Sequence, residues 1–294
     1  MILTVFTPVY NRADFLNAIY KSLKEQTVKD FEWLIVDDGS SDNCDNVLSD
    51  IVSNHNDSFR IRFYKKTNGG KHTAINLGVR ESEGELFLIL DSDDSLPPSS
   101  VATILQEYKD ISKDNSICGV SGLMAHHDGS LIGSGYPLNG MVASSLDLRY
   151  KYNVTGDLIE VFKTKVLREY PFPEIQGERF CPEALVWNRI AQKYKLKCFN
   201  EVVYYRDYLD GGLTDNIVKV RMKSPLASVI FYSELNQLNI PLKQKIKSAI
   251  NYWRFRFCLN GEKTLPHIKS QWFWVVPIAF FMHVNDLKKT RKNS

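Results

Sequence analysis

The chain has 294 residues, of which 44% are hydrophobic and 24% are charged, a balance that excludes an intrinsically disordered protein. Its five cysteines form no C-x-x-C pair, so neither a paired-cysteine zinc motif nor a disulfide framework is indicated. The net charge of +3 hides an asymmetry, because residues 1–218 carry 23 Lys and Arg against 31 Asp and Glu, whereas residues 219–294 carry 14 against three. The acidic main body argues against nucleic acid as a partner.

The first part of the chain alternates between expected strands and helices. Short apolar runs predict strands at residues 2–7, 32–36, 60–64 and 86–90. Between them, apolar residues three or four positions apart indicate helices, the first with the stripe Phe15, Leu16, Ile19, Tyr20 and Leu23. We expect Ser41 or Asp42 to cap the second helix. Such alternation predicts an α/β fold with a largely parallel sheet and right-handed crossovers.

The pattern changes after about residue 95. A helix is expected after Pro97 and Pro98, a strand at 117–123, and an irregular, glycine-rich stretch up to about residue 140. Residues 141–218 are mixed, and residues 219–294 are expected to be helical.

Carboxylates gather where two of the expected strands end. Asp37 and Asp38 follow one apolar run, and the sequence Asp91-Ser92-Asp93 follows another. In open α/β sheets ligands bind outside the carboxyl ends of the strands, so we expect these acids to border a ligand site. Carboxylates two positions apart on an extended chain project to the same side. Such oxygen ligands suit Mg²⁺ or Mn²⁺ shared with phosphate groups.

The order and spacing of these segments resemble the family 2 glycosyltransferases, which transfer sugars from nucleotide diphosphosugars on a GT-A fold. The matching stretches cover about the first 100 residues: TVFTPVYNRADFLNAIYKSLKEQT, FEWLIVDDGSSD, NGGKHTAINLG and GELFLILDSDD. The resemblance implies a GT-A catalytic domain at residues 1–218, with a Rossmann-like nucleotide-sugar half at 1–95 and an acceptor half at 96–218. A basic, aromatic-rich helical extension would follow at 219–294.

The resemblance implies a nucleotide site at the start of the chain. Thr7, Pro8 and Tyr10 would line the base pocket, with Tyr10 near the ring face. Asp38 would accept a hydrogen bond from the base, as the N3–H of uracil or thymine offers, and Lys71 would lie near the phosphates. Without the resemblance, Tyr10 and Lys71 are better explained by ordinary loop packing and a solvated charge.

The resemblance also assigns the metal ligands. Asp91 would lie at the ribose and the metal, and Asp93 would bind Mn²⁺ or Mg²⁺ directly. A metal bound there would take up charge on the departing diphosphate.

A transferase needs a base for the acceptor hydroxyl. Family members often carry a Glu-Asp pair in the second half, where this chain has Pro182-Glu183 in GERFCPEALVWNRI, so Glu183 is the candidate base. Alternatively, Glu183 is a first-turn charge that complements the helix dipole, and Asp157 is the competing candidate. Trp187 offers a face for an acceptor sugar, or else is an ordinary buried tryptophan.

Two further segments carry polar residues that do not indicate a particular function. His126 and His127 are interpreted as loop residues, because adjacent histidines do not generally aim at one ion. Arg206 with Asp210-Gly211-Gly212 is interpreted as part of a closing loop.

The basic end of the chain interleaves charges with aromatic residues. NYWRFRF, at 251–257, is followed by WFWVVPIAFF, at 272–281, and then by LKKTRK. About ten apolar residues are too few to span a bilayer, so we expect this segment to lie on an anionic membrane surface. The alternative is a set of ordinary packed helices with basic outer faces.

Together these features predict an inverting, metal-dependent glycosyltransferase. It would move one sugar from a nucleotide diphosphosugar, with UDP expected, to a hydroxyl of a glycan or polyprenyl-diphosphate-linked acceptor in cell-surface polysaccharide synthesis. The Q-x-x-R-W signature of processive members does not occur in the sequence. With no signal peptide at its start, the chain is expected in the cytoplasm, peripheral at the inner face of the membrane. The alternative function is a non-catalytic nucleotide-sugar or glycan-binding assembly protein with a degenerate site.

Overall fold

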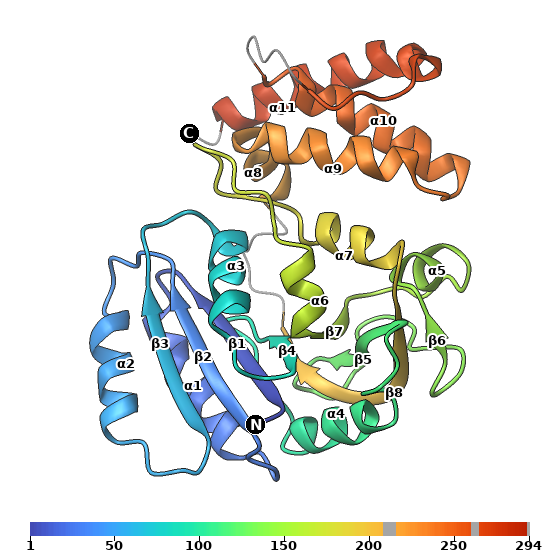
Figure 1. Cartoon of the computed structure of the whole chain (residues 1–294). Coiled ribbons are helices and arrows are strands. Elements are labelled where there is room, and N and C mark those ends of the chain that lie inside the picture. Colours follow the sequence, from blue (N-terminus) through green and yellow to red (C-terminus); the bar gives the residue numbers. More distant parts are fainter. Residues whose placement is uncertain (208–215, 260–264, 293–294) are drawn as a thin grey trace. The chain divides into compact units, whose positions relative to one another are not determined.

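The computed structural model describes residues 1–207, 216–259 and 265–292 (Figure 1). The chain forms two compact units. The first comprises Met1–Pro171 and Arg189–Asp207, and the second comprises Phe172–Asn188 and Tyr208–Ser294. The predicted boundary after residue 218 stays a prediction.

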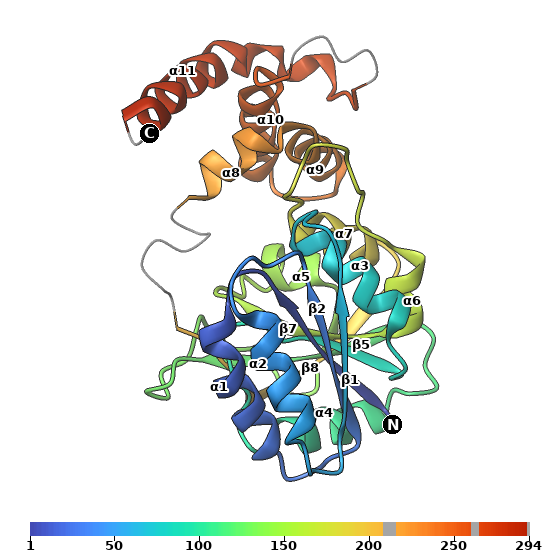
Figure 2. The ribbon, with the colours of Figure 1, turned by 90° about the vertical axis from the view of Figure 1, so that its left-hand side faces the viewer.

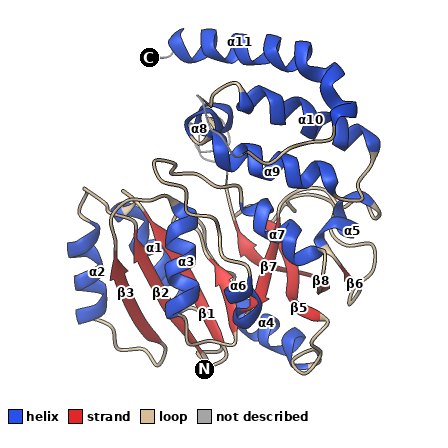
Figure 3. Cartoon of the chain, turned by 45° about the horizontal axis from the view of Figure 1, so that its top comes forward, coloured by secondary structure: helices blue, strands red, loops and turns tan. Residues whose placement is uncertain are grey.

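The first unit is built on a sheet with strand order β3-β2-β1-β4-β7-β5-β8-β6. The strands are β1 (Leu3–Val9), β2 (Phe31–Asp37), β3 (Arg60–Lys65), β4 (Leu86–Ile89), β5 (Ile117–Ala125), β6 (Val142–Ala143), β7 (Leu158–Lys163) and β8 (Lys195–Tyr205). Strands β3, β2, β1 and β4 are parallel neighbours, which confirms the predicted parallel half (Figure 3).

Strand β7 changes the pattern, because it runs antiparallel to both of its neighbours, β4 and β5. Strand β8 is parallel to β5. The carboxyl ends of β1 to β5 and β8 therefore point to one edge of the sheet, and so does the beginning of β7. This edge, called the strand-end edge below, is where loop residues from distant parts of the sequence are brought together.

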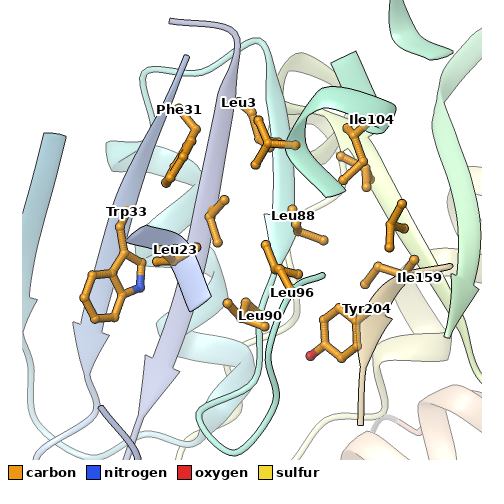
Figure 4. Close-up of a cluster of buried hydrophobic side chains, with 14 of the residues drawn as sticks. Leu3, Leu23, Phe31, Trp33, Leu88, Leu90, Leu96, Ile104, Ile159 and Tyr204 are labelled. Atoms are coloured by element: carbon orange, nitrogen blue, oxygen red, sulfur yellow. The ribbon is translucent and has the colours of Figure 1, made fainter. Parts of the chain in front are cut away.

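Helices cover both faces of the sheet. They are α1 (Ala13–Lys24), α2 (Cys44–Ser53), α3 (Lys71–Glu81), α4 (Ser100–Lys109), α5 (Ser145–Tyr150) and α6 (Thr164–Glu169) (Figure 2). The predicted stripe of α1 buries Leu16, Ile19 and Leu23, which cluster with strand residues such as Leu3 and Phe31 (Figure 4). These strand residues alternate with others that face α3 on the opposite side.

Helix α3 approaches the sheet closely because of a glycine. A Cβ on Gly78 would lie 2.2 Å from the ring of Phe6 on β1. Phe6 in turn stacks on Phe87 of β4, with ring centroids 5.0 Å apart. This contact fixes α3 on β1, and α3 begins at Lys71, next to the strand-end edge.

The second unit is helical in its described part, which confirms the predicted helical extension. It contains α8 (Ile217–Lys223), α9 (Pro225–Gln237), α10 (Leu242–Arg256), the 3₁₀ helix η1 (Ser270–Val275) and α11 (Val276–Lys292), and α7 (Glu183–Ala191) begins in it. Its core gathers Val229, Ala249, Tyr252, Phe255, Ile268, Trp272 and Val275. None of the helices in the described ranges has the length and apolar character needed to span a membrane.

Candidate active site

Asp38 organises the loop that leads into α3. Its carboxylate is buried and accepts hydrogen bonds from the backbone N–H groups of Gly69 (2.9 Å) and Gly70 (2.7 Å). The ammonium of Lys66, which follows β3, lies 2.7 Å from the same carboxylate and donates to Thr73. Gly70 has a φ of +93°, a conformation open to glycine. Asp38 therefore holds the loop in the shape that places Lys71 at the start of α3.

Lys71 joins this loop to the acids that follow β4. Its ammonium lies 2.6 Å from the carboxylate of Asp91, which is also 3.5 Å from the guanidinium of Arg206. Burial on its own raises the pKa of Asp91, but Lys71 and then Arg206 outweigh it, so the pKa lies below its ordinary value. Asp91 is thus kept ionised between two cations.

A buried tyrosine fixes the turn after β4. The backbone N–H of Asp91 donates to the hydroxyl of Tyr204 (3.0 Å), and this hydroxyl donates to the carboxylate of Asp94 (2.7 Å). Burial, and then the charge of Asp91, raise the pKa of Asp94 to about 7. Two neighbouring carboxyl groups therefore differ in ionisation, because near neutral pH Asp91 is charged whereas Asp94 is divided between its protonated and ionised forms.

Asp93 is half-buried, and within the described residues its carboxylate makes no hydrogen bond or ion pair. A carboxylate of this kind fits a divalent cation, since Mg²⁺ and Mn²⁺ prefer oxygen ligands and are commonly held by one or two carboxylates together with substrate phosphates. The described part of the chain contains no group of three or more His, Cys, Asp or Glu that could hold a metal. The residues present therefore fit a cation that phosphate oxygens help to bind.

The residues predicted to line the base pocket lie at the end of β1, with different exposure. Thr7 is fully buried, and its hydroxyl accepts a hydrogen bond from the indole of Trp33 (2.9 Å). Pro8 is buried and pairs with Val36 of β2. Tyr10, just past the strand, is 48% exposed. Of these three side chains, that of Tyr10 is open to a ligand.

The two candidate bases lie in different units. Asp157 precedes β7 in the first unit, and its carboxylate accepts a hydrogen bond from Arg206 (3.4 Å). Glu183 is the first residue of α7, in the second unit. Trp187, also in the second unit, packs edge-to-face on Phe172, with ring centroids 5.7 Å apart. The choice of base stays a prediction.

The two adjacent histidines share one carboxylate. Nδ1 of His126 lies 3.0 Å from one oxygen of Asp207, and Nδ1 of His127 lies 2.6 Å from the other. Nε2 of His127 lies 3.0 Å from the hydroxyl of Ser95. Both histidines lie in the loop that follows β5, and with Asp207 they join the ends of β5 and β8.

Sequence reasoning missed Lys66 and Tyr204 and gave Arg206 a different role. Lys66 and Arg206 each follow a strand directly, as Asp38 does, and Asp91 lies two residues past the end of β4. The rule that pointed to the acids therefore also points to these cations. Tyr204 lies inside β8 and carries no such signal. The glycines at 211–212 and Asp210, which were expected to form a closing loop with Arg206, lie outside the described residues.

Comparison with known proteins adds a family match. The model of the family described as glycosyl transferase family 2 matches residues 4–124. The chain is 35% identical over 243 residues to a hyaluronan synthase from Pasteurella multocida, which covers 81% of this chain and 24% of that protein. The chain thus spans about a quarter of that synthase's length.

A second relative is similar in length. It is a GalNAc(5)-diNAcBac-PP-undecaprenol beta-1,3-glucosyltransferase from Campylobacter jejuni, 27% identical over 219 residues. The match covers 72% of this chain and 67% of that protein.

Two solved structures share the fold at low identity. Residues 1–349 of S. aureus TarS, in complex with UDP-GlcNAc, superpose with a TM-score of 0.59 and 17% identity, over 95% of this chain and 79% of that one. The mannosyltransferase PcManGT from Pyrobaculum calidifontis, in complex with GDP-Man and Mn²⁺, has a TM-score of 0.55 and 18% identity, over 94% and 72%. These likenesses confirm the predicted GT-A-type α/β fold.

Proposed function

The chain belongs to glycosyltransferase family 2, and on that premise we propose that it is an inverting, metal-dependent transferase. It would move one sugar from a nucleotide diphosphosugar, with UDP as the expected nucleotide, to a hydroxyl of a glycan or lipid-linked acceptor. The main support is that Asp38 holds the loop before Lys71, and that Lys71 forms an ion pair with Asp91 at the strand-end edge. All three residues lie within the segment that the family model matches. We further propose the predicted division into a catalytic domain at 1–218 and an extension at 219–294.

On the donor side, the chain's own residues would bind and orient the nucleotide. Tyr10 offers an exposed ring beside the end of β1. Asp38 fixes the loop around Gly70, and the N–H of the base would have to approach a carboxylate that already accepts two backbone N–H groups. Lys71, held beside Asp91, lies where an ammonium would pair with a phosphate bound near that acid.

Asp93 is the residue best suited to hold Mn²⁺ or Mg²⁺, with Asp91 beside it. When bound, the cation would stabilise the negative charge that grows on the departing diphosphate. Support comes from the carboxylate of Asp93, which has no hydrogen bond or ion pair with any residue that the structure describes, and from the Mn²⁺ in the complex of PcManGT.

The proposed reaction is a single displacement. The acceptor oxygen forms a bond to the anomeric carbon while the bond from that carbon to the diphosphate oxygen breaks, so the configuration inverts. The acceptor proton passes to Glu183 or, as the alternative, to Asp157. The leaving group is a nucleoside diphosphate.

The acceptor class is inferred from a relative. The Campylobacter jejuni protein is named for an undecaprenol-linked acceptor, and a polyprenyl-diphosphate carrier would place the reaction at a membrane. We therefore propose a role in surface-polysaccharide synthesis, with the protein peripheral at the cytoplasmic face of the membrane. The hyaluronan synthase relative supports polysaccharide synthesis as the setting.

Turnover of the donor tests this proposal. We expect the full chain with Mn²⁺ to release UDP slowly from one UDP-sugar by hydrolysis, as measured by a coupled assay for UDP, and faster with a polyprenyl-diphosphate-linked acceptor. Nucleotide binding without release under any of these conditions would favour the alternative of a non-catalytic binding protein.

The two candidate bases are separated by matched variants. If Glu183 is the base, Glu183→Gln lowers the transfer rate by about 100-fold or more while Kd for the donor is unchanged, and Asp157→Asn has a smaller effect. The reverse order would assign the base to Asp157. Equal, small effects of both variants would contradict the assignment of either residue.

A further inference from the structure

Helix α11 buries its less hydrophobic side. The buried residues of α11 recur at helical spacing and are Ala279, His283 and Asp286. Asp286 forms a two-point ion pair with Arg254 of α10, whose Nη2 lies 2.7 Å from its carboxylate. A small residue, a histidine and an ion pair thus occupy the inner stripe.

The outer side of η1 and α11 is aromatic and exposed. Exposed fractions are 56% for Phe273, 56% for Trp274, 46% for Ile278, 54% for Phe280 and 70% for Phe281. Single exposed apolar residues are ordinary, but five of them between residues 273 and 281 form a cluster of the kind that marks an interaction site. We call these five residues the aromatic face.

The aromatic face is anchored on α10. The ring of Phe273 packs on Trp253, with centroids 5.6 Å apart, and the ring of Phe280 packs edge-to-face on Phe257, with centroids 5.4 Å apart. These contacts hold two of its members in place while most of their surface stays open. In the second unit, α11 packs mainly on α10 (Figure 3), with smaller contacts to η1 and α8.

The exposed charged side chains that border the aromatic face are basic. Lys269 precedes η1, and Lys288 and Lys289 lie in the last turns of α11, all exposed. Within the described segment 265–292 the one acid is Asp286, which is buried in its pair with Arg254. Basic residues therefore border the face at both ends, with no exposed acid between them.

We propose that the aromatic face is a membrane-docking surface that lies in the plane of an anionic lipid bilayer. Aromatic rings partition into the headgroup region, and basic residues at both ends pair with anionic headgroups. Helix α11 has 17 residues, about 26 Å at 1.5 Å per residue, and its described part does not meet the requirements of a membrane span, so a parallel orientation fits it.

A lipid surface fits the charges better than a second copy does. A symmetric contact through this face would bring Lys269, Lys288 and Lys289 of two chains together, and the described segment 265–292 has no exposed acid to pair with them. Anionic headgroups supply the missing opposite charge. The inference deepens the proposed function and rests on it for its purpose, because docking here would hold the enzyme at a lipid-linked acceptor.

Vesicle binding by the full chain tests the proposal directly. The wild type should sediment with vesicles of phosphatidylcholine containing phosphatidylglycerol, and much less with phosphatidylcholine alone. Trp274→Ser combined with Phe281→Ser should weaken binding at least tenfold. The control Leu138→Ser, at a leucine that is 68% exposed in the first unit, should bind as the wild type does.

A charge variant gives an independent readout. Lys288→Gln combined with Lys289→Gln should weaken binding to anionic vesicles about fivefold per lysine, whereas Lys21→Gln, at a lysine that is 78% exposed, should change nothing. Circular dichroism confirms that each variant is folded. If the aromatic variant binds vesicles as tightly as the wild type, the proposal is wrong.

The remaining outcomes separate this proposal from its rivals. A wild type that is dimeric without lipid, with an aromatic variant that is monomeric, would make the face an interface between two copies and overturn the proposal. Binding is measured without any sugar nucleotide, so failure of donor turnover would leave it standing. Turnover with no vesicle binding would overturn the docking surface alone.

Discussion

At the scale of single residues, Asp42 links the beginnings of two helices. One carboxylate oxygen accepts a hydrogen bond from the N–H of Ala13 (3.0 Å) at the start of α1, and the other accepts from the N–H of Cys44 (3.2 Å) at the start of α2. The N-cap position of α2 is Asn43, so the predicted cap at Ser41 or Asp42 was placed too early, although the side chain of Asp42 does accept the first N–H of the helix. Its second role, for α1, could not be predicted, because it depends on how the loops after β1 and β2 meet.

Asp42→Ala should lower the free energy of unfolding by about 1 kcal/mol at neutral pH, since it removes the side-chain acceptor of the first N–H of both helices. Slight burial raises the pKa of Asp42, but the hydrogen bonds from Cys44 and Ala13 outweigh it, so the folded-state pKa lies below the ordinary 3.8. The stabilisation is therefore complete above that value and is lost as the pH falls through the folded-state pKa. Urea unfolding at pH 7 and pH 3 measures the difference.

The control is Asp50→Ala, at an exposed acid inside α2. It should change the free energy of unfolding by less than about 0.5 kcal/mol at either pH. If wild type and Asp42→Ala differed in stability by the same amount at both pH values, the ionised carboxylate of Asp42 would not be what stabilises the two helix starts.

At the scale of elements, β3 carries two arginines in different surroundings. Arg62 is 14% exposed and lies 3.1 Å from the carboxylate of Glu32, which is fully buried in β2. Arg60 lies 2.8 Å from Glu83, and both of their side chains are about half exposed. Glu32 also accepts a hydrogen bond from Thr4 of β1 (2.7 Å), so the buried pair ties three neighbouring strands together.

Arg62→Gln should lower the free energy of unfolding by about 3 kcal/mol, because it leaves a buried carboxylate without its cation. Arg60→Gln, the matched change on the same strand, should cost less than about 1 kcal/mol, because exposed pairs contribute little. Guanidinium unfolding of both variants provides the measurement. If both variants lost the same free energy of unfolding, the burial of Glu32 would not determine how strongly its ion pair with Arg62 stabilises the protein.

The strands and helices could be predicted from the pattern of neighbouring residues, but the contacts between them could not. The runs before Asp38 and Asp91 and the stripe of α1 depend on neighbouring residues, so strands and helices could be predicted. Strand β7 gave no local sign that it would run antiparallel between β4 and β5. Because of that placement Asp157 reaches Arg206, and parallel pairing of β8 with β5 brings Tyr204 to Asp94.

The same distinction applies to the candidate site. Asp38, Lys71, Asp91 and Asp93 were selected by motif, and the ion pair of Lys71 with Asp91 joins two of the selected residues. The second cation on Asp91 comes from Arg206, more than 100 residues further along the chain. No spacing rule predicts such a contact, because it requires the sheet order.

At the scale of the whole molecule, the chain combines two units of different character. The first carries the residues that the family model matches, and the second contains the basic, aromatic end of the chain. The charge asymmetry was readable from composition. Which side of α11 faces outward was not, because the inner side is occupied by Ala279, His283 and Asp286 and only the folded helix shows that the larger aromatics stay exposed.

In the proposed site, the strand-end edge binds a sugar nucleotide, and Asp93 binds the metal. Thermal unfolding of the full chain with UDP-, GDP- and dTDP-sugars, with and without Mn²⁺, tests this claim most directly, because a ligand that binds only the folded state raises its stability. We expect one nucleotide to raise the melting temperature, more so with Mn²⁺, and Asp93→Asn to lose the Mn²⁺-dependent part. No shift with any nucleotide, or an unchanged Mn²⁺-dependent shift in Asp93→Asn, would contradict the claim.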